Sequence, residues 1–321
     1  MTRFPPLPQP MNAQGDPRRV GVEIELGNLN EDHVAELAKQ VFGGNIRTKD
    51  TVYHVEGTDI GDLEIYLDTA LTKARKSALR DMALDLGHEV IPVEIVTEPL
   101  DMDGLEQLDD FTDLLRREGA TGSGAGILLG FGVHLNVEIT SEKPADILRP
   151  LMAYALIEDW MRKTHPIDES RRLLPFTAPY PTSFVRALIA LGPDAGIDVL
   201  TECYLAETPS RNHGLDMFPL LAHLRPDAMS DKLRGSTKPR PAFHFRLPDC
   251  RIDDPDWSLA EEWRRWLVVE RVAANADLLT RLSDAWLDDH GPVTFSRTSW
   301  AARTAEILPP ELETAFQGEP L

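Results

Sequence analysis

Acidic and imidazole side chains recur on five short stretches in which polar and apolar residues alternate. These stretches are residues 22–26, 63–68, 93–95, 133–139 and 243–247. Side chains alternate across a β-strand, so each stretch has one apolar face and one polar face. The polar positions carry no lysine; they are Glu23, Glu25, Glu64, Asp68, Glu94, His134, Asn136, Glu138, His244 and Arg246. If the five strands are neighbours in one sheet, these groups gather in one place.

Clustered carboxylates require a compensating positive charge. Two carboxylates ~4 Å apart repel by about 4 kcal/mol at an effective dielectric constant of 20. Oxygen ligands with a minority of imidazole are typical of Mg²⁺ or Mn²⁺ sites rather than Zn²⁺ sites. Arg246 adds a group suited to a phosphate or carboxylate. The alternative, an ordinary solvated sheet face, explains any single strand well, but the whole set favours a metal and phosphate site.

The elements that must position these residues follow from periodicity. Strands with one apolar face are typical of a largely antiparallel sheet with helices on that face, so we expect an α+β fold. Apolar residues recur with helical spacing at 30–43, 72–86, 105–115, 148–163 and 184–191. Ser258 and Glu261 have the spacing of a capping box and predict the start of another helix.

Composition limits the classes of protein. The 321 residues carry a formal net charge of −20, which disfavours binding to nucleic acid or to anionic membranes. No apolar run approaches the ~20 residues of a membrane helix, and the start of the chain lacks the apolar core of a secretory signal. Cys203 and Cys250 form no CxxC motif, so we expect a reducing, cytoplasmic location. We expect a disordered tail over 1–17, one catalytic domain over 18–308 and a flexible tail over 309–321.

Four segments occur in a familiar order: RRVGVEIELG, PVEIVTEPL, FGVHLNVEI and PAFHFRLP. In this order the chain resembles the bacterial amidoligase family, the carboxylate–amine ligases related to glutamine synthetase and glutamate–cysteine ligase. The resemblance runs from about Arg18 to Leu247. It implies a glutamine-synthetase-like catalytic fold, in which the concave face of the sheet holds ATP and Mg²⁺ or Mn²⁺.

The resemblance also implies roles for individual residues. Glu23, Glu25, Glu94 and His134 match metal ligands of the family. Asp59 or Asp68 matches the acid that precedes Glu94; we place Asp59 among the expected ligands, although the spacing does not separate the two. The family usually has a glutamate two residues before Arg246, where this chain has His244. We expect His244 to lie on the same face and to act as a ligand in place of that acid.

The remaining expectations concern ATP and the reaction. Arg246 matches the family arginine that neutralises transferred phosphate, and we expect Asn136, Arg211 and Arg246 to contact the nucleotide or an acidic substrate. Arg246, Glu94 and Glu138 are the expected catalytic residues. Glu138 and Glu64 are alternative bases for deprotonating the amine.

The implied reaction is ATP-dependent amide formation through an acyl phosphate, with small-molecule or peptide acids and amines as substrates. A homo-oligomer is compatible with the sequence. The alternatives are a catalytically impaired nucleotide-binding or metal-binding relative and a guanidino phosphotransferase, which would be expected to use a reactive cysteine.

Two groups of basic residues have open roles. Lys232, Arg234, Lys238 and Arg240 precede the last strand, where they could meet phosphates or form a solvated loop. Arg171 and Arg172 are interpreted as a charged helix end, with a place in the pocket as the alternative.

Overall fold

The computed structural model describes residues 2–68, 91–124, 130–172, 177–291 and 297–316. The helix expected at 72–86 therefore lies outside the described residues. So do the side chains of Lys232 and Arg234.

One eight-stranded sheet organises the molecule, in the order β2-β3-β4-β5-β1-β6-β8-β7. All seven ladders between neighbouring strands are antiparallel. The strands are β1 (Val20–Leu26), β2 (Asn45–Lys49), β3 (Val52–Glu56), β4 (Leu63–Leu67), β5 (Val93–Thr97), β6 (Val133–Glu138), β7 (Leu215–Asp216) and β8 (Ala242–Phe245). The α+β fold with an antiparallel sheet is confirmed. The five expected strands are β4, β5, β1, β6 and β8, and they are consecutive neighbours in the sheet.

The helices expected within the described residues are also present. They are α1 (Glu31–Phe42), α3 (Met102–Arg117), α4 (Pro144–Thr164), α6 (Thr182–Leu191) and α10 (Leu259–Ala274). The Ser258 hydroxyl accepts from the Glu261 amide, so the predicted cap does begin α10. The others are α5 (Glu169–Arg172), α7 (Ile197–Glu207), α8 (Phe218–Leu224), α9 (Asp231–Ser236), α11 (Ala276–His290), α12 (Thr298–Ile307) and α13 (Pro310–Phe316).

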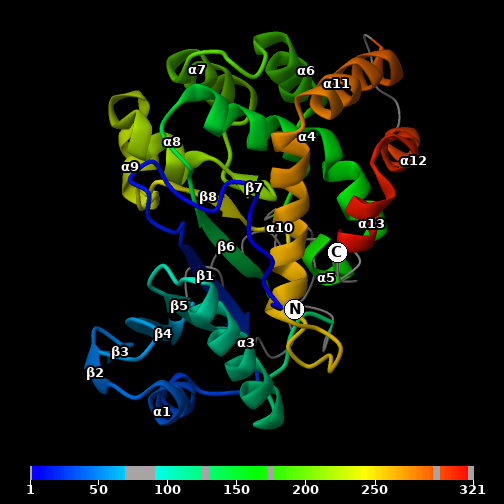
Figure 1. Cartoon of the computed structure of the whole chain (residues 1–321). Helices are drawn as coiled ribbons and strands as arrows, with labels where there is room; N and C mark the ends of the chain where they lie inside the picture. The colour runs from blue at the N-terminus through cyan, green and yellow to red at the C-terminus, as the bar shows by residue number, and fades with distance from the viewer. Residues whose placement is uncertain (1, 69–90, 125–129, 173–176, 292–296, 317–321) are drawn as a thin grey trace, which may run out of the picture.

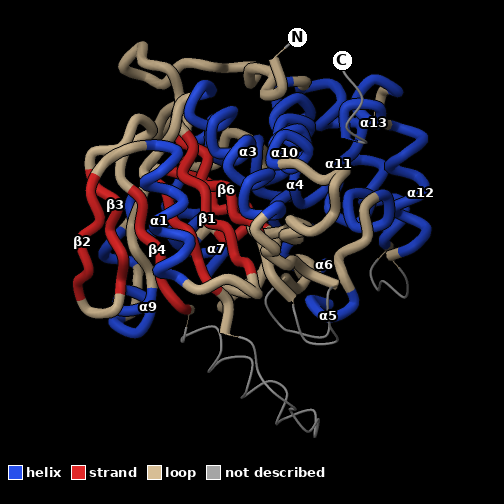
Figure 2. The backbone as a smooth tube through the Cα atoms, turned by 90° about the horizontal axis from the view of Figure 1, so that it is seen from below, coloured by secondary structure: helices blue, strands red, loops and turns tan. Residues whose placement is uncertain are grey.

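The apolar face of the sheet packs against helices. Trp266 of α10 lies with its ring 5.2 Å from that of Phe243 and 5.6 Å from that of Phe245 on β8. At the other end of the sheet, α1 packs on β3 and β4. Figures 1 and 2 show most helices gathered beside the sheet rather than spread around it. The opposite, polar face is therefore left to carry the site.

The segment 2–17 packs on the domain, in contrast to the disordered tail expected from its composition. Phe4 and Leu7 are buried, and Trp263 Nε1 of α10 donates to the Pro5 carbonyl at 2.7 Å. The expectation rested on the average polarity of the segment and overlooked Phe4 and Leu7. The burial of these two side chains offsets the entropy cost of ordering the chain. In Figure 1 the blue trace of this segment runs along α10 before it enters β1.

The end of the chain is ordered as well, up to the last described residue. The helix α13 covers most of the stretch expected to be flexible, and the Phe316 ring lies 4.6 Å from the Trp160 ring of α4.

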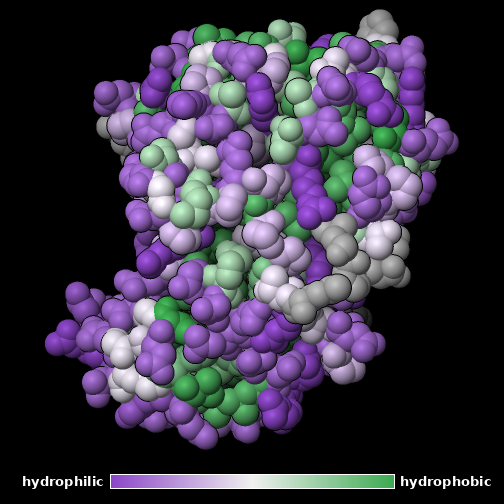
Figure 3. All heavy atoms as spheres, in the orientation of Figure 1, coloured by the Kyte–Doolittle hydropathy of each residue, from purple (hydrophilic) through white to green (hydrophobic). Residues whose placement is uncertain are grey.

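The surface in the view of Figure 3 is mostly hydrophilic, in keeping with the acidic composition. Among the described residues, none of the helices combines the length and apolar character needed to cross a membrane.

Candidate functional site

The centre of the polar face is Glu23 on β1, which pairs directly with His134 on β6. His134 Nδ1 lies 2.8 Å from Glu23 Oε2, and Asn136 Nδ2 donates to Glu23 Oε1 at 2.9 Å. Arg240 Nη2 lies 3.3 Å from the same oxygen. Burial by itself raises the pKa of Glu23, but the hydrogen bond with His134 and the positive charge of Arg240 oppose it, and that pKa lies well below its usual range. Glu23 is therefore ionised.

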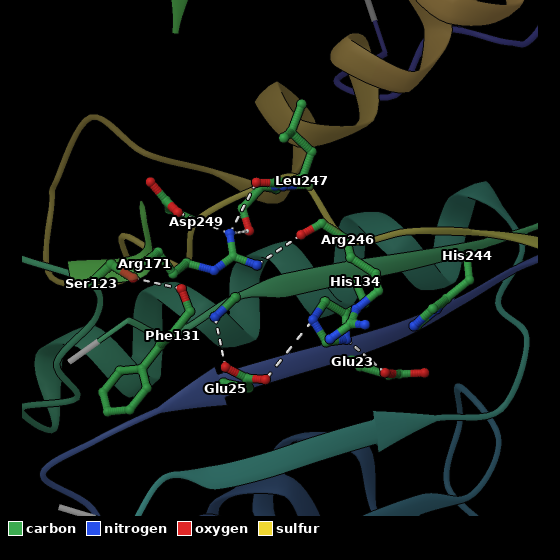
Figure 4. A network of polar contacts seen from close by, with 12 residues as sticks. Glu23, Glu25, Ser123, Phe131, His134, Arg171, His244, Arg246, Leu247 and Asp249 are labelled. Atoms are coloured by element: carbon green, nitrogen blue, oxygen red, sulfur yellow. Dashed lines mark hydrogen bonds and ion pairs between the residues drawn. The ribbon is translucent and has the colours of Figure 1, made fainter. Parts of the chain in front are cut away.

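His244 on β8 pairs with Asn136, which links it to Glu23. The Asn136 amide donates to Glu23, so its Oδ1 faces His244 Nδ1 at 2.7 Å. Arg240 Nη2 lies 3.1 Å from the same ring nitrogen. Burial lowers the pKa of His244 well below its usual value, so the ring is neutral. The ring lies edge-on to His134 with the centroids 5.2 Å apart, on the polar face as expected (Figure 4).

Two further carboxylates flank this centre. Glu25 pairs with Glu94 across β1 and β5, and both are buried. Gly132 N donates to Glu25 Oε2 at 2.8 Å, and His134 Nε2 lies 3.9 Å from Glu25 Oε1. Burial raises the pKa of Glu94 well above its usual value, and the charges of Glu23, Glu25 and Asp68 raise it further. Carboxyl groups are therefore concentrated beside the histidines, and the raised pKa favours the protonated form of Glu94.

The structure separates Asp68 from Asp59. Asp68 follows β4, on the same face as Tyr66, which pairs with Glu94. It is close enough to raise the pKa of Glu94, whereas Asp59 is exposed in the turn between β3 and β4, where its amide donates to the Phe42 carbonyl. The placement of Asp59 among the ligands is not supported by this geometry, because the exposed turn holds Asp59 outside the strands that carry the polar face. Of the two aspartates, Asp68 is the one whose charge raises the pKa of Glu94.

Arg246 lies just beyond the end of β8, among other charged groups. Its Nη1 donates to the Arg211 carbonyl at 2.8 Å, and Arg211 Nε donates to the wholly buried Asp216 at 2.9 Å. Within the described part of the chain, Arg246 Nε is a buried atom without a hydrogen-bond partner. Burial lowers the pKa of Arg246, and Asp216 opposes that shift. The geometry brings Arg246 and Arg211 together.

Arg171 is a site residue that the sequence undervalued. It is buried and pairs with Asp249 at 2.9 Å, while Nη2 donates to the Arg246 carbonyl at 2.7 Å (Figure 4). It reaches this position because Gly132 has no side chain: a Cβ there would lie 2.6 Å from Arg171 Nη2. Gly130 and Gly132, which precede His134 in the sequence, were the signal that another side chain packs closely there. Arg172 is exposed, as a charged helix end would be.

A pocket of about 380 Å³ opens beside Glu23. Its walls are mostly apolar, and the charged residues Arg19, Glu138 and Arg240 also line it. The lining residues are Arg19, Gly21, Glu23, Val96, Thr97, Pro99, Asn136, Glu138, Arg240, Pro241 and Ala242. The structure thus places Arg240 at the site rather than in a solvated loop. Glu64, one of the two expected bases, lies outside this lining and is about half exposed.

The donors fit a divalent cation. Glu23, His134 and His244 each offer one ligand atom, and these atoms lie within 4.8 Å of one another. Glu25 and Glu94 supply further oxygens next to them. Carboxylates with imidazole match the preferences of Mn²⁺ and related ions.

The fold is thus an antiparallel sheet that carries acids, imidazoles and arginines on one face, beside a pocket. Residues 16–268 match the model of a family described as "putative amidoligase enzyme". The chain belongs to this amidoligase family, whose description indicates a ligase-type enzyme. A search of curated proteins finds no match.

Proposed function

We propose that this chain is an ATP-dependent carboxylate–amine ligase that forms an amide through an acyl phosphate. The observation that carries the proposal is the convergence of Glu23, His134 and His244 beside a pocket that also holds Arg240. Membership of the amidoligase family supports amide formation. A pocket of about 380 Å³ lies in the usual range for small-ligand sites.

The reaction has two steps. A carboxylate oxygen of the acid attacks the γ-phosphorus of ATP, the bond to the β–γ bridging oxygen breaks, and ADP leaves. The amine nitrogen then attacks the carbonyl carbon, the C–O bond to phosphate breaks, and inorganic phosphate leaves with the bonding electrons. One proton passes from the nitrogen to a base. The protein must hold the reactants and offset charge, which acids, arginines and preorganised dipoles can do.

The site residues divide these tasks. Arg240 and Arg246 stand on either side of His244 in the sequence, and each has a buried Nε without a hydrogen-bond partner among the described residues. Each can therefore donate to a phosphate oxygen. Glu23, His134 and His244, with Glu25 and Glu94, would hold the divalent cation, which when bound would draw charge from phosphate oxygens. Glu138 and Glu64 stay alternative bases: Glu138 lines the same pocket as Glu23, but both of its oxygens already accept hydrogen bonds from Asn12 and Arg19.

One observation favours the alternative of a catalytically impaired nucleotide-binding or metal-binding relative. None favours a guanidino phosphotransferase. His244 replaces a family acid and brings no negative charge. A reactive thiolate needs a lowered pKa, but burial raises the pKa of both Cys203 and Cys250.

Hydroxylamine tests the proposal because it replaces the unknown amine and gives a coloured iron complex of the hydroxamate product. The purified protein would be incubated with ATP, Mg²⁺ or Mn²⁺, hydroxylamine and a panel of amino acids, peptides and simple carboxylic acids. We expect hydroxamate and ADP in equal amounts with at least one acid, and none with His134→Ala. If the wild type releases ADP at the same rate as His134→Ala and forms no hydroxamate across the panel, the ligase proposal is wrong.

A further inference from the structure

The first inference concerns which cation binds to the cluster of Glu23, His134 and His244. It rests on the proposed function in that it uses the same residues. Two of the three convergent donors are imidazoles, from His134 and His244, and one is the carboxylate of Glu23. A set of two histidines and one carboxylate suits a first-row transition ion, whereas Mg²⁺ prefers an all-oxygen shell.

The hydrogen bonds around His244 prepare it as a nitrogen ligand. His244 Nδ1 lies 2.7 Å from Asn136 Oδ1 and 3.1 Å from Arg240 Nη2, and these two contacts fix the ring orientation. The Asn136 amide also donates to Glu23 at 2.9 Å, so one side chain orients two of the donors. Outer partners of this kind typically change metal affinity by about 10–100-fold when they are lost.

We infer that His244 makes this cluster selective for Mn²⁺, or another first-row transition ion, over Mg²⁺. A carboxylate at this position would favour Mg²⁺ by adding oxygen and negative charge, whereas a second imidazole favours a transition ion.

The experiment measures ion binding without ATP, acid or amine. Free Mn²⁺ is followed by its electron paramagnetic resonance signal, and Mg²⁺ by competition against Mn²⁺. We expect wild-type protein to bind Mn²⁺ at least about tenfold more tightly than Mg²⁺, and His244→Glu to reduce that ratio by about tenfold or more. Spin-echo modulation from imidazole nitrogen should be present in the wild type and weaker in His244→Glu.

His54→Ala is the matched control, because His54 lies on the same sheet face but pairs with Glu64 on β4, away from the cluster. It should leave the ratio unchanged. A wild type that prefers Mg²⁺, binds neither ion, or keeps its ratio in His244→Glu overturns the inference. Hydroxamate formation is a separate readout, so failure of the selectivity inference and failure of the ligase proposal are distinguishable.

A second inference starts from an independent observation, the contact of the segment 8–19 with the pocket. Asn12 Nδ2 donates to Glu138 Oε1 at 3.0 Å, and Arg19 N donates to Glu138 Oε2 at 2.9 Å. Asn12 Oδ1 accepts from the amides of Gln14 and Asp16, so the same side chain closes the turn. Both oxygens of a pocket carboxylate are thereby occupied by this segment.

Arg18 fastens the segment in place. It forms a buried bidentate pair with Glu270 of α10, at 2.9 and 2.7 Å, and donates to the carbonyls of Gln9 and Glu138. The turn that carries Asn12 is therefore tied both to α10 and to β6. Residues 8–15 nevertheless precede the part of the chain that matches the family model.

We propose that Asn12 is a positioning residue for the nucleotide pocket, a proposal that rests on the proposed function. By donating to Glu138 it keeps that carboxylate against the pocket wall. Without this donor the carboxylate can turn toward the pocket and repel a polyphosphate.

The test compares the affinities for ATP with Mn²⁺ of the wild type, Asn12→Asp, Glu138→Gln and the double variant. The aspartate retains the acceptor that closes the turn but places a second carboxylate against Glu138, so we expect at least about tenfold weaker binding. In the double variant the amide introduced at position 138 can donate to the carboxylate introduced at position 12, and the affinity should recover above that of Asn12→Asp. Adenosine, which carries no phosphate, should bind equally to wild type and Asn12→Asp.

Arg3→Ala is the control, since Arg3 pairs with Asp109 and Asp110 and anchors the preceding residues of the chain away from the pocket. It should leave ATP affinity unchanged. If Asn12→Asp binds ATP as tightly as the wild type, or if the double variant shows no recovery, Asn12 has no positioning role. If the wild type binds no ATP, the nucleotide pocket itself is wrong, and this proposal falls with it.

Discussion

Glu25 and Glu94 stand directly opposite each other on β1 and β5, and both side chains are buried on the polar face of the sheet. Opposed carboxylates in adjacent strands are unfavourable unless a proton or a cation relieves the repulsion. In the protein alone a proton on Glu94 relieves the repulsion, because burial and the neighbouring acids raise the pKa of Glu94. A divalent cation would take over that role.

Cation binding should therefore release a proton and strengthen as the pH rises. Below the raised pKa of Glu94 the cation competes with a bound proton, and above it the carboxylate is free to bind. Calorimetric titration with Mn²⁺ in buffers of different ionisation enthalpy measures the released protons. Glu94→Gln should reduce the proton count and flatten the pH dependence; an unchanged count in that variant would contradict this role for Glu94.

Glu23→Gln should weaken Mn²⁺ binding by at least about tenfold while the protein stays folded. Glu23 is the shared neighbour of His134, Asn136 and Arg240, but its side chain lies away from the helix-packed core. Isothermal titration gives the affinity, and the melting temperature in chelator gives the stability. Glu56→Gln on β3 is the matched control, because the Glu56 side chain is about half exposed and lies away from the cluster. Equal affinities for the two variants would remove Glu23 from the site.

Arg171→Ala should lower the free energy of unfolding by about 3–5 kcal/mol, because it leaves the buried Asp249 without its partner. It should also loosen the Arg246–Asp249 backbone, whose carbonyls Arg171 holds. Arg172→Ala, at an exposed neighbouring position, should change stability by less than about 0.5 kcal/mol. Chemical denaturation measures the free energy of unfolding of both variants. Equal values would show that the Arg171 network contributes little to stability.

Phe4→Ala should cost about 3 kcal/mol, because Phe4 is buried in a segment that the sequence suggested was disordered. Met11, in the same segment, is 45% exposed, and Met11→Ala should have little effect. Thermal unfolding of the two variants checks the packing. If the Phe4 variant melts like the wild type, the segment does not stabilise the domain.

The sequence by itself determined the strands and the face on which each chemical group lies. Alternation with a period of two is a local property, so Glu23, Glu25, His134 and His244 could be assigned to one face without knowledge of strand order. A helix start that is marked by a capping residue, such as Ser258, is also a local property and could be predicted in the same way. The edge strands β2 and β7 and the neighbouring strand β3 had no comparable pattern and were missed.

Only the tertiary structure decided which groups meet. Register pairs Glu23 with His134 and Glu25 with Glu94, and it brings Asp68 rather than Asp59 toward Glu94. Arg171, Arg240 and Asn12 reach the site through turns and loops, whose paths depend on packing far along the chain. Residue spacing records the period of a strand or helix, but it does not record the contacts that fold one segment against another.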